Sequence, residues 1–106
     1  MLRHYILDAN GDPVEVDDFL TWGRWFETAH RVIASDKDES VGADGVHVST
    51  VFLGLDHNFD AVGPPVLWET MVFGGPLHGE QDRYASRAAA LEGHQAMCAR
   101  VKAATR

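Results

Sequence analysis

A chain of 106 residues has room for one domain and one hydrophobic core, so we expect residues 1–106 to form a single domain. Hydrophobic residues make up 45% of the chain and charged residues 24%, which excludes a disordered or fibrous protein. The formal net charge is -7, and the single cysteine, Cys98, excludes an internal disulfide. No apolar run approaches the roughly 18 residues of a membrane span, and the N-terminus does not fit a signal peptide. We therefore expect a cytoplasmic protein, in a host's cytoplasm if the gene is viral.

The N-terminal part predicts a hairpin followed by a helix. Residues 3–7 are aromatic and β-branched, which favours an edge strand. Residues 10–13 (Asn-Gly-Asp-Pro) are typical of a turn, and the alternation over 14–16 predicts a short return strand. Asp17 or Asp18 then caps a helix whose apolar residues recur every three or four positions. Its apolar stripe consists of Phe19, Trp22, Trp25, Phe26 and Ala29. We expect this aromatic helix to fill most of the core.

The rest of the chain predicts a sheet and a second helix. Residues 31–34 favour a first strand, residues 35–45 an exposed loop, and residues 46–53 the clearest strand. In that strand Val46, Val48, Thr50 and Phe52 share one face. A long connection over 54–65 leads to a second strong strand over 66–73 and a short one over 81–85. Ser86 caps a final helix. The expected fold class is α+β, an antiparallel sheet of four to five strands with two helices packed on one face.

Negative charge is concentrated in the middle of the chain. Residues 38–82 contain eight acidic residues and no lysine or arginine, whereas residues 83–106 carry five basic residues and one acid. The acidic segment argues against direct binding to nucleic-acid phosphates and fits a basic protein surface better. The alternative is that these acids only keep a small domain soluble.

The connection over 54–65 holds the most enzyme-like cluster of the sequence, Asp56 and His57 with Asp60 close by. A histidine beside a carboxylate suits a general base or a metal ligand. The alternative is loop organisation, in which Asp56 and Asn58 bind nearby backbone amides. Phe59 would then be an apolar tip within an acidic loop, which is a plausible anchor for a partner.

His94 and Cys98 stand four residues apart on the predicted helix, so they share a face and could form half of a zinc site. The missing half would have to come from His57, His78 or Glu69. The alternative is that both side chains only pack inside the fold. We predict no cofactor and no metal site, because no complete ligand set stands at a diagnostic spacing.

Glu69 is unusual because it lies in the middle of a predicted strand between Trp68 and Met71. On a solvent-exposed sheet face it would point outward with His47 and Ser49. In a sheet covered on both faces it would need a partner such as Arg24 or His94.

Several stretches of the chain resemble a group of small uncharacterised proteins encoded in phage, prophage and bacterial genomes. They include STVFLGLDHNF over 49–59 and ETMVFGG over 69–75. The further resembling stretches are 4–8, 11–14, 22–27 and 93–97. The resemblance implies a phage context, in which some small acidic proteins counter host defence, for example by blocking CRISPR effectors. It assigns no catalytic residue.

Our main hypothesis is a non-enzymatic binding protein, such as an inhibitor of a host defence complex, that blocks a basic partner surface sterically and electrostatically. It involves neither nucleic acid nor membrane as a direct partner. The expected partner-binding residues are Asp56, His57, Asn58, Phe59, Asp60, Asp44 and Glu69. One alternative is a metal-dependent or acid–base enzyme that uses His57, Asp56, Glu69 and His94. Another is a homodimer that pairs through an exposed sheet edge or the open sheet face.

Overall fold

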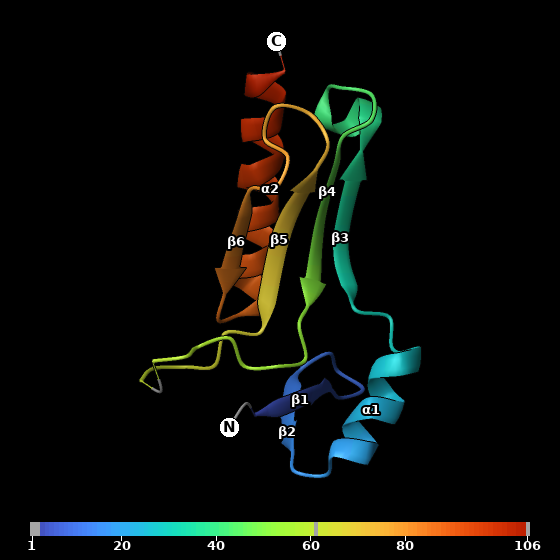
Figure 1. Ribbon diagram of the computed structural model, residues 1–106, viewed down its shortest axis with the longest axis vertical. Helices are drawn as coiled ribbons and strands as arrows, with labels where there is room; N and C mark the ends of the chain where they lie inside the picture. The colour runs from blue at the N-terminus through green and yellow to red at the C-terminus, as the bar shows by residue number, and fades with distance from the viewer. Residues whose placement is uncertain (1–2, 61, 106) are drawn as a thin grey trace.

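The computed structural model describes residues 3–60 and 62–105. Within them the chain forms two antiparallel sheets and two α-helices, with one 3₁₀ turn, η1 (Figure 1). The elements are β1 (His4–Leu7), β2 (Pro13–Val16), α1 (Phe19–Thr28), β3 (Val32–Lys37), η1 (Asp38–Val41), β4 (His47–Phe52), β5 (Trp68–Phe73), β6 (Gln81–Tyr84) and α2 (Arg87–Ala104).

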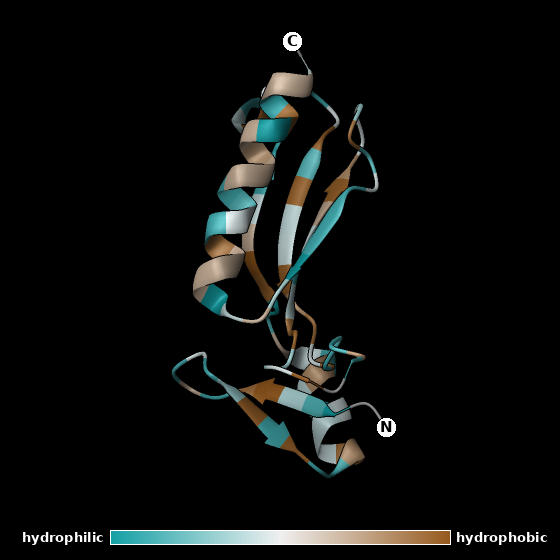
Figure 2. Cartoon of the chain, turned by 90° about the vertical axis from the view of Figure 1, so that its left-hand side faces the viewer, coloured by the Kyte–Doolittle hydropathy of each residue, from teal (hydrophilic) through white to brown (hydrophobic). Residues whose placement is uncertain are grey.

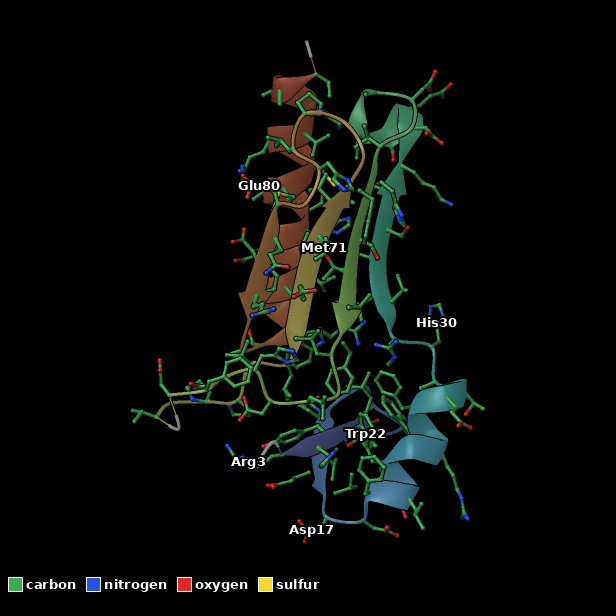
Figure 3. All side chains as sticks on the ribbon, viewed as in Figure 1. Arg3, Asp17, Trp22, His30, Met71 and Glu80 are labelled. Atoms are coloured by element: carbon green, nitrogen blue, oxygen red, sulfur yellow. The ribbon has the colours of Figure 1, made fainter. Side chains whose placement is uncertain are left out.

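The larger sheet is an antiparallel meander in the order β3-β4-β5-β6. The 18-residue helix α2 runs along one face of this sheet and contacts all four of its strands (Figure 2). Met71 lies on the opposite face, which no helix of the described residues covers (Figure 3). The predicted class is confirmed, since the fold is α+β with a four-stranded antiparallel sheet and two helices packed against sheet.

Side-chain alternation along the two central strands decides which face meets α2. Val48, Thr50 and Phe52 of β4 are buried, and their neighbours are partly exposed. In β5 the residues of the buried face are Trp68, Thr70 and Val72. These are the faces that the period-two pattern of the sequence predicted.

Two apolar clusters form the core, one near each end of the large sheet. The first lies between α2, η1 and the β4 and β5 ends near the β3–β4 loop; it consists of Val41, Val46, Val48, Val72, Met97, Cys98 and Val101. The second joins the sheet to the N-terminal hairpin; it consists of Tyr5, Phe52, Leu67, Trp68 and Ala90.

The hairpin and α1 form a smaller unit at one end of the molecule, which we call the N-terminal lobe (residues 3–30; Figure 1). As predicted, β1 pairs with β2, and Asp18 caps α1 by accepting a hydrogen bond from the Leu20 amide at 3.0 Å. Gly54, two residues after the end of β4, contacts this lobe. Its φ is +78°, a conformation that favours glycine, and a β-carbon there would lie only 3.2–3.3 Å from the rings of Trp22 and Phe26.

The expectation that α1 fills most of the core is wrong. None of its residues is buried, and Phe19 is 62% exposed. The ten-residue helix lies against β1 and β2, at the end of the large sheet instead of on its face. Its aromatic rings therefore pack mainly on one another and on His4, and Trp25 alone makes a ring contact with β4, at Phe52.

Candidate functional site

The loop between β4 and β5 is organised around the carboxylate of Asp56. One carboxylate oxygen accepts hydrogen bonds from the backbone amides of Asn58 and Val66, at 2.8 and 2.9 Å. The other accepts from the Arg3 guanidinium at 3.2 Å. Asp56 is 6% exposed, so this one side chain closes the base of the loop and ties it to the N-terminal strand. The loop-organising alternative predicted for Asp56 is the one found.

The pKa of Asp56 reflects these contacts. Burial alone would raise the pKa of the carboxyl group, but the two amide hydrogen bonds and Arg3 outweigh burial and lower it. Asp56 therefore remains a carboxylate at neutral pH. A group held in this way is a structural anion and not a proton-transferring base.

Asn58 orders the tip of the same loop. Its side-chain amide donates to the carbonyls of Val62 and Pro64, at 2.7 and 2.9 Å, and its oxygen accepts from the Asp60 amide at 3.2 Å. Two apolar side chains stand out from this frame, since Phe59 is 69% exposed and Val62 is 79% exposed. The loop thus presents a preformed apolar tip next to an exposed carboxylate.

Five of the seven predicted partner-binding residues lie together in this loop, namely Asp56, His57, Asn58, Phe59 and Asp60. The His57 ring lies 5.7 Å from that of Phe59, and its Nδ1 contacts the Leu55 carbonyl at 2.8 Å. Asp44 lies elsewhere, in the β3–β4 loop at the opposite end of the large sheet (Figure 1). The seven residues therefore do not form one continuous surface.

Glu69 lies on the open face of β5, opposite Arg83 of β6, to which it is paired at 2.9 Å. This is the outward orientation that the sequence allowed, with His47 and Ser49 on the same face. His94 lies on the other side of the sheet, beside Thr50. Hence Glu69 and His94 cannot both belong to one catalytic site with Asp56 and His57.

A second cluster lies between α2 and the edge strand β3. His94 is fully buried, and its Nε2 donates to the carboxylate of Asp36 at 2.6 Å. The Cys98 sulfur is 3.7 Å from the same carboxylate oxygen. His94 and Cys98 do share a face of the helix, as predicted. The third member is Asp36, and not His57, His78 or Glu69.

Sequence reasoning missed Asp36 because residues 35–45 were expected to be an exposed loop. In the structure β3 continues to Lys37, and Val41 of the following η1 is buried. Asp36 pairs with Val48, a residue of the covered face, so its side chain is directed toward α2. Extending the first strand to match the length of the second would have found it.

The pKa values of the two acids in this cluster shift in opposite directions. The hydrogen bond from His94 holds the pKa of Asp36 below its ordinary value. Burial, followed by the negative charge of Asp36, raises the pKa of the Cys98 thiol to about 11. Cys98 is therefore a protonated thiol at neutral pH, which disfavours nucleophilic attack by its sulfur in this environment.

A buried polar chain extends from this cluster into the sheet. His94 Nδ1 lies 2.7 Å from the Thr50 hydroxyl, which in turn contacts the Thr70 hydroxyl. The order Asp36, His94, Thr50 has the acid–base–hydroxyl sequence of a nucleophilic triad. Thr50 is fully buried, however, so no substrate could reach it, and the chain satisfies polar groups inside the fold instead.

An open cleft of about 420 Å³ separates the N-terminal lobe from the start of the large sheet. It has an apolar wall that includes Trp25 and Ile33 and a polar rim that includes Asp8, His30 and Arg87. None of the predicted site residues lines it.

Comparisons with protein-family models, curated proteins and solved structures found no match to this chain. The resemblance to phage-encoded proteins therefore stays a prediction. Neither helix of the described residues is both long enough and apolar enough to cross a bilayer.

Proposed function

We propose that this chain is a non-enzymatic binding protein that uses the loop of residues 56–66 to dock on a basic surface of a partner protein. The observation that carries the proposal is the combination of hydrogen bonds among the described residues of the loop, 56–60 and 62–66, with two exposed apolar side chains, Phe59 and Val62.

The order of the loop supports binding because association then costs less conformational entropy. The side chains of Asp56 and Asn58 already hold the backbone on either side of Phe59. A loop that is rigid before binding loses little freedom when it docks, so more of the contact energy remains as affinity. An exposed aromatic residue on such a loop is a typical binding anchor.

The charge of the surrounding segment supports a basic protein partner. Residues 38–82 contain no lysine or arginine, and Asp60 lies exposed directly beside Phe59. Such a surface repels nucleic-acid phosphates and attracts a positively charged protein surface. The narrower proposal, that the partner belongs to a host defence complex, depends on the sequence resemblance alone.

The test is a pull-down from host lysate with the purified chain at low and high salt, followed by affinity measurement on the captured protein. We expect a basic partner whose binding weakens as salt rises, because screening shortens the range of the attraction. Phe59→Ala should cost at least about 2 kcal/mol of binding free energy, as expected for a central anchor.

Phe19→Ala is the matched control, because it removes the same side chain at a similar exposure from a different element, α1. It should leave the affinity unchanged. Binding that is insensitive both to salt and to Phe59→Ala would refute the proposal. Capture of nothing but a second copy of this chain would favour the homodimer instead.

A further inference from the structure

Three side chains of the kinds that bind zinc converge between β3 and α2. Asp36, His94 and Cys98 each place one oxygen, nitrogen or sulfur atom within 4.8 Å of the other two. They come from two elements, since Asp36 lies on the edge strand and the other two lie one helical turn apart on α2. Carboxylate, imidazole and thiolate are all common zinc ligands.

The second nitrogen of His94 has a hydrogen-bond partner of its own. Its Nδ1 lies 2.7 Å from Thr50, which fixes the plane of the ring and directs Nε2 toward Asp36. Ligand histidines usually have such a partner on the nitrogen that does not face the ion. Thr50 in turn contacts Thr70, and either hydroxyl can donate in that pair.

The cluster is buried at His94 and Cys98 and reaches solvent at Asp36. His94 is fully buried and Cys98 is 6% exposed, whereas the side chain of Asp36 is 32% exposed. An ion could therefore enter past Asp36, and water could complete its coordination there. Three protein ligands with one open position is the arrangement of many zinc centres.

We propose that Asp36, His94 and Cys98 bind one zinc-type divalent ion and so link the edge strand β3 to α2. This site is separate from the loop of residues 56–66, and neither proposal depends on the other.

Only small movements of the three side chains are needed to bring their ligand atoms to the spacing of a tetrahedral zinc site. Two ligands of a tetrahedral zinc ion lie about 3.3–3.6 Å apart. The Cys98 sulfur and the Asp36 oxygen are already 3.7 Å apart, while His94 Nε2 and Asp36 are 2.6 Å apart and must separate slightly. The partly exposed Asp36 side chain is free to make that shift.

The Cys98 thiol releases its proton to solvent and binds the ion as a thiolate. With His94 neutral, its proton moves from Nε2 to Nδ1, where it is donated to Thr50, and the Thr50–Thr70 hydrogen bond reverses. One proton is therefore released for each ion bound.

The test is titration of the untagged full chain with Co²⁺, a coloured substitute for zinc. We expect one ion per chain, the visible absorption of a tetrahedral site, and a near-ultraviolet thiolate-to-cobalt band. Because Cys98 is the only cysteine, no other residue of the chain could produce that band. Zn²⁺ should displace the cobalt and remove the colour.

Two variants and a control assign the ligands. Cys98→Ser should abolish the near-ultraviolet band, and Asp36→Asn should raise the Kd for cobalt by at least about tenfold. His30→Ala removes an exposed histidine outside the cluster and should change neither the near-ultraviolet band nor the Kd for cobalt. Circular dichroism in the absence of metal shows whether each variant is folded.

Nitrogen-15 chemical shifts of the His94 ring give a second readout that does not depend on the variants. Zinc should leave the ring protonated at Nδ1 and bound through Nε2. Absence of a thiolate band in the wild-type chain, or weak octahedral cobalt absorption that Cys98→Ser does not change, would overturn the proposal.

Discussion

Single carboxylates do much of the ordering in this small protein. Asp56 holds the β4–β5 loop closed, and Asp36 satisfies the fully buried His94. Each carboxylate accepts more than one hydrogen bond, Asp56 in a buried place and Asp36 with its side chain 32% exposed. Replacing either one would leave buried donors without acceptors, which typically costs about 1–3 kcal/mol of stability.

At the residue scale, the lowered pKa values predict how stability depends on pH. Both Asp36 and Asp56 have pKa values below those of the unfolded chain. Their stabilising effect is therefore fully present above the unfolded pKa of about 4, and it is lost as the pH falls through the folded values. We expect the melting temperature to drop as the pH falls below about 4.

Asp56→Asn tests the contribution of one of these groups. The variant should be less stable at pH 7, and its melting temperature should depend less on pH in the acidic range. Asp60→Asn, at an exposed position of the same loop, should follow the wild-type profile. An Asp56→Asn profile parallel to that of the wild type would show that the group does not contribute to the acid transition.

At the scale of elements, the two helices differ in how closely they pack on their neighbours. The space around one glycine in each helix shows this difference. A β-carbon added to Gly93 of α2 would collide with the ring and hydroxyl of Tyr84, which lies directly over the helix. Nothing lies within 4 Å of a β-carbon added to Gly23 of α1. Gly93 thus allows α2 to pack closely on β6, whereas Gly23 has no packing role.

The same substitution at both positions should therefore have opposite effects. Gly93→Ala should lower the free energy of unfolding by about 1–3 kcal/mol, because Tyr84 or the helix must move. Gly23→Ala should raise it by about 0.5–1 kcal/mol, the usual gain in a helix interior. Urea unfolding of the two variants checks both signs, and a stabilising Gly93→Ala would mean that α2 does not pack on Tyr84.

At the scale of the whole molecule, the N-terminal lobe forms one end of an elongated molecule that measures 47 × 30 × 22 Å. Its attachment includes Trp22 (Figure 3), whose indole donates to the Gly54 carbonyl and, within the lobe, to the Tyr5 carbonyl. The Tyr5 amide also donates to the Gly54 carbonyl. The ring of Trp25 also packs edge-on against Phe52.

This attachment predicts that the lobe opens before the sheet does. Because α1 buries none of its residues and α2 buries five, amide hydrogens of α1 should exchange much faster than those at the centre of α2. Trp22→Phe removes the indole donor and should accelerate exchange in α1 further while changing α2 little. Equal protection of the two helices would show that the whole chain unfolds as one unit.

Much of the local structure was predictable from neighbouring residues. The hairpin, the caps Asp18 and Ser86, and the buried faces of β4 and β5 depend on turn chemistry and side-chain alternation, which short stretches of sequence contain. The ordering role of Asp56 was also predictable as one of two alternatives, because its hydrogen bonds to Asn58 and Val66 are local.

The tertiary structure alone decided which distant residues meet. Asp36 and His94 are 58 positions apart, and only the pairing of β3 with β4 under α2 brings them into contact. The exposure of Phe19 likewise follows from the place of α1 at the end of the sheet, since an apolar stripe shows that a helix has an inner face but not how completely that face is covered. Local patterns depend on a few neighbouring residues, whereas these contacts depend on how whole elements pack.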